Sequence, residues 1–180
     1  MRELYRVWPS ELGSKDIDRL LQAAQNRPVE TGKVFSPTDA LSEMRSCQVQ
    51  WLPESWIQDL LWPYVENAAT HAFDVSVHNR AEVQLATYSA QHGDHYDWHQ
   101  DVYWNDQSDS DRKLSITVQL SHSRDYTGGA FEFEDIQTNA DFRSRGTILI
   151  FPSYLRHKVH RVTSGSRRAL VAWFFGPRWR

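Results

Sequence analysis

From about residue 81 onward, apolar and polar residues alternate with a period of two, and this pattern constrains the fold more than any other feature of the chain. The alternation is clearest at residues 83–87 and 114–120. Successive side chains of a β-strand point to opposite faces of a sheet, so the pattern predicts strands with one buried face. Further strands are predicted at 131–134, 147–151 and 169–175, between turns rich in glycine and serine. Many short strands with such turns favour a β-sandwich or jelly roll.

Two segments before residue 81 carry helical patterns instead. In the first, apolar residues recur at spacings of three and four, at Ile17, Leu20, Leu21 and Ala24. The second runs from about residue 55 to residue 73 and contains Pro63. Pro63 is expected to kink or divide this helix, because proline lacks the N–H group that an inner helical turn needs. Both helices are predicted to pack against the strands, so we expect a mainly β protein with flanking helices.

The length of 180 residues suits one domain with a full hydrophobic core. We expect a single domain over residues 1–180, in which 1–80 are mostly helical support and 81–177 form the jelly-roll core with the functional site. Charged residues make up 24% and hydrophobic residues 40% of the chain, which is typical of a globular protein. The net charge of −3 offers no general attraction to a phosphate backbone, so nucleic acid is not an expected partner.

The chain contains one cysteine, Cys47, so no internal disulfide is expected and a reducing compartment is indicated. Cys47 itself is predicted to be a small, buried apolar residue. No stretch approaches the roughly 20 apolar residues of a membrane span, and the first residues lack the apolar core of a signal peptide. We therefore expect a cytoplasmic protein without membrane association.

Three side chains in the C-terminal half form a candidate metal site: His99, Asp101 and His157. Residues two apart on a strand share a face, so His99 and Asp101 can converge on one ion. The third ligand has to come from a distant strand, which a jelly roll brings close. Two imidazoles and one carboxylate favour iron(II) or manganese(II) and leave coordination positions open, as in non-haem iron(II) oxygenases. By position alone His160 is an alternative third ligand, on the opposite side of the same strand.

Several short motifs surround these residues in a characteristic order. They are Tyr88, Tyr96-x-x-His99-x-Asp101, Arg112-Lys113-Leu114-Ser115, Leu120-Ser121, Tyr126-x-Gly128-Gly129, Phe151-Pro152-Ser153 and His157-x-Val159-x-x-Val162-Thr163-x-Gly165-x-Arg167. With these motifs the chain resembles the 2-oxoglutarate and iron(II)-dependent dioxygenases of the prolyl 4-hydroxylase type, especially bacterial and phage members, over roughly half its length. The resemblance implies a double-stranded β-helix, a cupin-like jelly roll.

The resemblance also implies an enzyme that uses iron(II), O2 and 2-oxoglutarate. In such an enzyme 2-oxoglutarate is decarboxylated to succinate while one oxygen atom hydroxylates a substrate. His99, Asp101 and His157 would be the catalytic metal ligands. His157 is preferred to His160 because the spacing to Arg167 then agrees with the family. A requirement for ascorbate is a further expectation from the family alone.

Four residues are expected to contact 2-oxoglutarate. Arg167, ten residues after the distal histidine as in the family, would bind the distal carboxylate, because a guanidinium forms two parallel hydrogen bonds with a carboxylate and keeps its charge. Tyr88 matches a tyrosine that hydrogen-bonds the cosubstrate in the family. Thr163 and Ser115 are expected to offer further hydroxyl groups.

Aromatic residues flank the predicted metal site and are candidates for substrate contacts: Trp98, Tyr103 and Trp173. Aromatic walls suit a proline ring or another flat or apolar group. The polar residues 105–112 are predicted to form a mobile loop beside them. By resemblance, the first hypothesis is hydroxylation of a peptidyl proline. Hydroxylation of a free amino acid or other small metabolite, and a non-catalytic metal-binding jelly-roll module, are the alternatives; the oligomeric state is not predicted.

Overall fold

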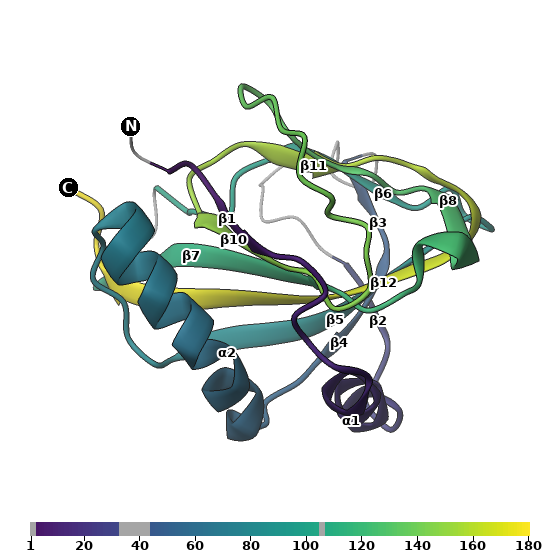
Figure 1. Cartoon of the computed structure of the whole chain (residues 1–180), viewed down its shortest axis with the longest axis horizontal. Helices are drawn as coiled ribbons and strands as arrows, with labels where there is room; N and C mark the ends of the chain where they lie inside the picture. The colour runs from purple at the N-terminus through teal and green to yellow at the C-terminus, as the bar shows by residue number, and fades with distance from the viewer. Residues whose placement is uncertain (1–2, 33–43, 105–106) are drawn as a thin grey trace.

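The computed structural model describes residues 3–32, 44–104 and 107–180, whose strands form two antiparallel β-sheets (Figure 1). The larger sheet has the order β1 (Arg6–Trp8), β10 (Ile148–Pro152), β7 (Ser110–Gln119), β12 (Val162–Pro177), β5 (Ala81–Ser89), β4 (Gln48–Trp51) and β2 (Glu30–Thr31). The smaller sheet has the order β3 (Arg45–Ser46), β6 (His95–His99), β11 (His157–Val159) and β9 (Phe131–Phe133). The short strand β8 (Tyr126–Gly128), which follows the 3-10 turn η3 (Ser123–Asp125), pairs with the beginning of β12.

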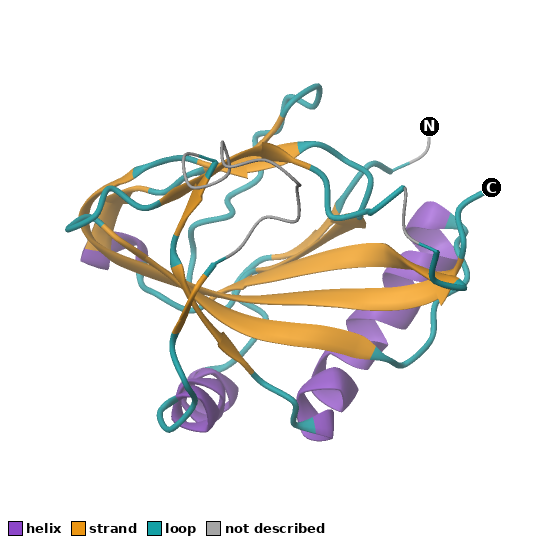
Figure 2. Cartoon of the chain, turned by 180° about the vertical axis from the view of Figure 1, so that it is seen from behind, coloured by secondary structure: helices purple, strands orange, loops and turns teal. Residues whose placement is uncertain are grey.

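The two sheets face each other. The helices cover the face of the larger sheet that points away from the smaller sheet (Figure 1 and Figure 2). Strand β12 pairs first with β8 and then runs between β5 and β7 through the centre of the larger sheet. This arrangement is the jelly roll with flanking helices that the sequence predicts. The predicted metal ligands lie in the space between the two sheets.

Alternate residues of the central strands face the helices. Side chains of the larger sheet that are buried in one hydrophobic cluster with the helices are Val83, Leu85, Ile116, Val118, Leu170, Ala172 and Phe174. Helix α1 (Ser14–Ala24) contributes Ile17, Leu20 and Ala24 to this cluster, as its helical spacing predicts. Each fully buried leucine or isoleucine stabilises the fold by about 1.5–3 kcal/mol. The residues that alternate with these helix-facing side chains point to the smaller sheet, and several of them are polar.

Helix α2 (Ser55–Ala68) continues through Pro63, so Pro63 does not divide the helix. Pro63 is exposed, and the carbonyl group of Asp59 that loses its N–H partner can therefore bind water. The helix changes to a short π-helical turn, η2 (Ala69–Phe73), and ends at Asp74, which has a φ of 53°.

Two further features differ from the sequence-based expectation. The segment before residue 81 contributes β1, β2, β3 and β4 to the sheets in addition to the helices. The predicted polar loop at 105–112 is shorter, because β7 already begins at Ser110; residues 105 and 106 lie outside the described residues. Among the helices of the described segments, none has the length and apolar character needed to cross a bilayer.

Candidate metal centre

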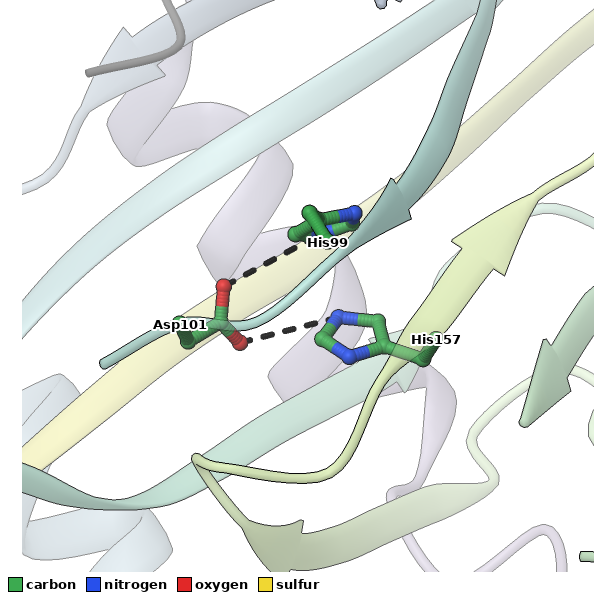
Figure 3. Close-up of side chains that lie close together, drawn as sticks. All are labelled: His99, Asp101 and His157. Carbon is green, nitrogen blue, oxygen red and sulfur yellow. Dashed lines mark ion pairs between the residues drawn. The ribbon is translucent and has the colours of Figure 1, made fainter. Parts of the chain in front are cut away.

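His99, Asp101 and His157 come together between the two sheets (Figure 3). His99 is the last residue of β6, His157 is the first of β11, and the two are register partners. Asp101 lies just beyond the end of β6, where its backbone N–H donates to the carbonyl oxygen of Ser153 at 2.9 Å. Each of the three offers one ligand atom, and these atoms lie within 4.8 Å of one another. Since metal–ligand bonds of this type are about 2.0–2.2 Å long, small adjustments place all three on one ion.

Backbone carbonyl groups orient both imidazoles. His99 Nδ1 lies 2.7 Å from the carbonyl oxygen of Asp97, and His157 Nδ1 lies 2.9 Å from that of Leu155. A carbonyl oxygen only accepts, so each Nδ1 carries the proton and each Nε2 keeps its lone pair. The Nε2 atoms face the carboxylate of Asp101, at 3.8 Å from Oδ1 for His99 and 3.6 Å from Oδ2 for His157 (Figure 3). Hydrogen bonds of this kind fix metal-ligand orientation.

The charge states of these groups suit a divalent metal ion. Burial, reinforced by the neighbouring His157, lowers the pKa of His99 to about 3, so this imidazole is neutral at pH 7. Burial opposes ionisation of Asp101, but the two imidazoles and the hydroxyl group of Ser115 outweigh it and hold the pKa of the carboxyl group below its ordinary value. Two imidazole nitrogens and an ionised carboxylate, without sulfur, fit iron(II) with open coordination positions.

Ser115 supports the metal ligand. Its Oγ lies 2.6 Å from Asp101 Oδ2 and 2.9 Å from Ser153 Oγ. A hydroxyl group has one proton, which the carboxylate attracts more strongly than a second hydroxyl group does. Ser115 therefore donates to Asp101; it also lines the cavity beside the metal site, and its expected contact with the cosubstrate stays a prediction.

Tyr96 faces the metal site because of a β-bulge. Strands β6 and β11 pair His99 with His157 and Tyr96 with Val159, so three residue steps along β6 match two along β11. The extra residue turns Tyr96 to the same side as His99. The two rings stack with centroids 3.3 Å apart and planes 7° apart. A regular period of two places Tyr96 on the opposite side, which is why sequence reasoning missed this contact.

A cavity next to the metal site contains Arg167 and Tyr88. Arg167 is 4% exposed and is the register partner of Tyr88, whose ring centroid lies 5.6 Å from the guanidinium carbon. The Arg167 Nε donates to Gln119 Oε1 at 3.1 Å. No carboxylate of the described residues lies within ion-pair distance of Arg167. Because a buried cation without a counter-charge is unfavourable, this position favours an anionic ligand.

The hydroxyl group of Tyr88 is a proton donor that hydrogen-bonds the buried thiol of Cys47. Burial raises the pKa of Tyr88 above its ordinary value, although the nearby cations Arg45 and Arg167 oppose that effect. The hydroxyl group therefore stays protonated at neutral pH. Arg45, which also lines the cavity, was not among the predicted site residues; it lies 54 positions before His99, and the pairing of β3 with β6 brings it beside Tyr96.

Thr163 lies outside the cavity, contrary to the prediction. It is exposed, and its Oγ1 lies 2.8 Å from Oγ1 of Thr127. Thr163 and Arg167 have the same parity on β12, but the register of β12 shifts between Val162 and Ser164, and Gly165 has a φ of +67°. These irregularities break the alternation, so parity does not carry from Arg167 back to Thr163.

Trp98 and His160 also lie away from the cavity. Trp98 precedes His99 and points to the other face of β6, where the Lys158 ammonium group lies 4.3 Å from its ring centroid. Trp98 does not line the cavity or the pocket beside the metal site, and its contact with a substrate stays a prediction. His160 is exposed and hydrogen-bonds the carboxylate of Glu132, which excludes it as the alternative ligand in this structure.

An outer pocket opens from the metal site and has an aromatic wall. Residues that line it include Trp51, Gln84, Tyr103, Arg112 and Trp173. The guanidinium carbon of Arg112 lies 4.0 Å from the Trp173 ring centroid and 5.1 Å from that of Tyr103. Trp51 and Tyr103 are 41% and 38% exposed, so they form the rim. Tyr103 and Trp173 were predicted as substrate contacts; Trp51 and Gln84 were not.

Solved prolyl hydroxylases share this fold. The chain is similar to the 2OG complex of a viral collagen prolyl hydroxylase from Paramecium Bursaria Chlorella virus-1, with a TM-score of 0.70, 18% identity and 97% of both chains covered. It is also similar to a prolyl hydroxylase from Trichoplax adhaerens in complex with a hypoxia inducible factor peptide fragment, with a TM-score of 0.74, 18% identity, and 96% of this chain and 84% of that chain covered. At this identity the likeness shows the fold, the double-stranded β-helix that the resemblance implied.

Sequence comparison covers the metal site itself. A PKHD-type hydroxylase from Idiomarina loihiensis is 36% identical over 84 residues, which are 46% of this chain and 38% of that relative. The match thus spans well under half the length of the relative. Residues 83–175 match a family sequence profile. This range contains every residue of the metal centre and also Arg167. Because this profile covers more than half of the 180 residues, the chain belongs to the 2OG-Fe(II) oxygenase superfamily.

Proposed function

We propose that this chain is a 2-oxoglutarate- and iron(II)-dependent dioxygenase that hydroxylates a peptidyl proline or a similar group. The observation that carries the proposal is that Arg167 lies in the same cavity as His99, Asp101 and His157. A purely structural metal site needs no buried cation beside it. A dicarboxylate that binds the ion through one end does need a cation for its other carboxylate.

The chain's own residues would hold iron(II) through two imidazole Nε2 atoms and one carboxylate oxygen. Both Nδ1 atoms are engaged with backbone carbonyl groups, so each imidazole presents its Nε2 atom to the metal. Iron(II) and 2-oxoglutarate, when bound, supply the oxidative decarboxylation that allows one atom of O2 to enter a C–H bond of the substrate. The protein supplies the placement of the reacting groups.

Arg167 and Tyr88 would position the cosubstrate. Arg167 presents its two Nη groups for a bidentate contact with the distal carboxylate, and the protonated Tyr88 hydroxyl, which contacts Cys47 in the ligand-free chain, would donate a hydrogen bond to the cosubstrate. Phe131 and Phe151 complete the wall of the cavity on the side of the metal site. Such apolar walls exclude water, which strengthens the charged contacts inside.

The aromatic outer pocket supports a polypeptide substrate. Tyr103 and Trp173 offer flat apolar surfaces that suit a proline ring. Trp51 and Tyr103 are exposed at the rim, so a substrate chain can continue outward on both sides of the residue that is hydroxylated. The two similar solved structures are named as a collagen prolyl hydroxylase and as a prolyl hydroxylase with a bound peptide fragment, which points the same way.

An anaerobic titration with iron(II) and then 2-oxoglutarate tests the cosubstrate. The expected result is the visible charge-transfer band of a metal-chelated keto acid. Asp101→Ala is expected to abolish the band while circular dichroism stays unchanged, because the site loses its one charged ligand. His160→Ala is the matched control and is expected to keep the band, since His160 is exposed and bound to Glu132. A wild-type protein that binds iron(II) without the band would refute the proposal.

Tandem mass spectrometry tests the substrate class. After O2 is admitted, proline-containing peptides are expected to gain the mass of one oxygen atom, together with release of succinate. An oxygen gain on free amino acids only would refute the polypeptide part of the proposal and leave the dioxygenase part intact.

A further inference from the structure

Arg167 is held in its cavity by the side chain of Gln119, which comes from the end of β7. Arg167 Nε donates to Gln119 Oε1 at 3.1 Å, and the two residues are 4% and 2% exposed. Because Nε lies at the inner corner of the guanidinium group, this bond fixes the plane of the group and leaves its two terminal Nη groups unused. Within the described residues, the side-chain hydrogen bond of Arg167 is donated by Nε, and no bond from either Nη group to the protein is found.

The amide of Gln119 has only one satisfactory orientation. Its Nε2 donates to the hydroxyl oxygen of Tyr126 at 3.1 Å and to the carbonyl oxygen of Ser121 at 3.2 Å. A reversed amide would set an N–H group against the N–H of Arg167 and an oxygen against the carbonyl of Ser121. Tyr126 is itself 2% exposed, and the guanidinium carbon of Arg143 lies 4.5 Å from its ring centroid. The acceptor for Arg167 is therefore fixed by several buried neighbours.

The aliphatic stem of Arg167 is confined from another side by Gly129. This glycine has a φ of +60°, and a Cβ added to it would lie 3.1 Å from Arg167 Cδ and 3.0 Å from Val162 Cγ2. The backbone thus approaches the arginine stem as closely as packing permits. Between Gly129 and Gln119, the guanidinium group has little freedom to turn away from the cavity.

We propose that Gln119 is a positioning residue that, through Arg167, makes the cosubstrate pocket selective for 2-oxo acids with a second carboxylate. It orients the guanidinium group, and as a neutral acceptor it leaves the positive charge available to the ligand. A carboxylate at position 119 would pair with Arg167 and cancel that charge. An apolar side chain at position 119 would leave the positive charge of Arg167 in place, but it would no longer hold the guanidinium group in one orientation. The inference rests on the proposed function and concerns which keto acid is preferred.

The test compares equilibrium binding of two ligands to the anaerobic iron(II)-loaded protein, by calorimetry and by the visible band. One ligand is 2-oxoglutarate. The other is 2-oxopentanoate, which has the same five-carbon chain but a methyl group in place of the distal carboxylate. The ratio of the two Kd values measures the selectivity. Gln119→Met is expected to lower the preference for 2-oxoglutarate by about 10-fold, the value of one charge-assisted hydrogen bond.

Gln119→Glu is expected to lower the preference by about 100-fold or more, because the ligand then competes with a buried carboxylate for the same cation. The matched control is Gln50→Met. Gln50 Nε2 also donates to two carbonyl oxygens, those of Ala24 and Arg27, but near α1, on the side of the larger sheet away from the cavity. This variant is expected to keep the wild-type ratio.

The outcomes separate a positioning role from a structural one. If both Kd values rise by the same factor in Gln119→Met, or if the ratio stays at the wild-type value, the proposal is wrong. Should Gln119→Glu fail to fold, the nearly isosteric methionine variant decides the question. A wild-type protein that binds iron(II) but neither keto acid would instead refute the proposed function, which is a different result from lost selectivity in the Gln119 variants.

Discussion

Arg167→Met is expected to weaken 2-oxoglutarate binding strongly while leaving the ligand-free fold at least as stable. Arg167 is 4% exposed, and its side-chain hydrogen bond goes to a neutral amide, that of Gln119. Burying a cation without a counter-charge opposes folding by several kcal/mol, of which a bond to one neutral acceptor offsets about 1.5–3 kcal/mol. Methionine keeps most of the apolar stem and leaves Gln119 Oε1 unsatisfied, at about 1–3 kcal/mol. The balance predicts a free energy of unfolding that is unchanged or higher by up to about 2 kcal/mol.

Binding of 2-oxoglutarate responds in the opposite direction. The substitution removes a bidentate, charge-assisted contact with the distal carboxylate. With about 1.5–3 kcal/mol for each of its two hydrogen bonds, the loss is at least about 3 kcal/mol, and Kd rises at least about 100-fold. Urea unfolding of the metal-free protein measures the first effect, and anaerobic titration of the iron(II)-loaded protein measures the second.

Arg145→Met is the control for this prediction. Arg145 Nε donates to the carbonyl oxygen of Leu120 at 2.9 Å, and its Nη2 pairs with Asp18 at 3.2 Å. Its loss is expected to lower the free energy of unfolding by about 1–2 kcal/mol and to leave the Kd of 2-oxoglutarate unchanged. If Arg167→Met were destabilised as much as Arg145→Met and still bound 2-oxoglutarate like the wild type, the assignment of Arg167 to the cosubstrate would be refuted.

Three further outcomes follow from the contacts of single residues. Acidification from pH 6.5 to pH 5 is expected to destabilise the metal-free protein by about 1.5 kcal/mol, because His99 takes up a proton near pH 6.5 when unfolded but only near pH 3 when folded. Urea unfolding at both pH values measures this loss in the free energy of unfolding. An equal loss in His99→Gln would show that protonation of His99 is not the cause. Ser115→Ala removes the hydroxyl group that donates to Asp101 and is expected to weaken metal binding about 10–100-fold in a chelator competition, with recovery in Ser115→Thr. Gly32→Ala places a Cβ 2.6 Å from Cys47 Sγ and is expected to lower the free energy of unfolding by about 1–3 kcal/mol, whereas an unchanged calorimetric midpoint would argue against this close packing.

The parts of this structure that follow local periodicity were predictable from the sequence. Alternation indicated the strands β5 and β7, and helical spacing indicated the buried face of α1. His99, Asp101 and His157 were found because a recognisable order of motifs surrounds them, and the structure brings their ligand atoms together. These signals are carried by neighbouring residues, so they need no knowledge of strand pairing.

The parts that depend on pairing between strands were not predictable. The bulge in β6 brings Tyr96 beside His99, and the register shift in β12 takes Thr163 out of the cavity, although strict alternation gives the reverse in both cases. A bulge arises from the fit of two strands that are distant in the sequence. Arg45 and Gln119 were missed for a related reason, since they reach Tyr96 and Arg167, respectively, only after the sheets have formed.

Both metal-binding imidazoles take their orientation from a carbonyl group two residues earlier in the same chain. Each ring is thus fixed by its own segment of backbone and does not depend on the ion to direct it. Protein from which a chelator has removed the metal is therefore expected to keep the same rotamers and to accept a fresh ion without rebuilding the barrel. When the metal is removed and added back repeatedly, the rate of reloading is then expected to depend on the supply of metal. The free energy of unfolding of the metal-free protein is expected to stay the same from cycle to cycle.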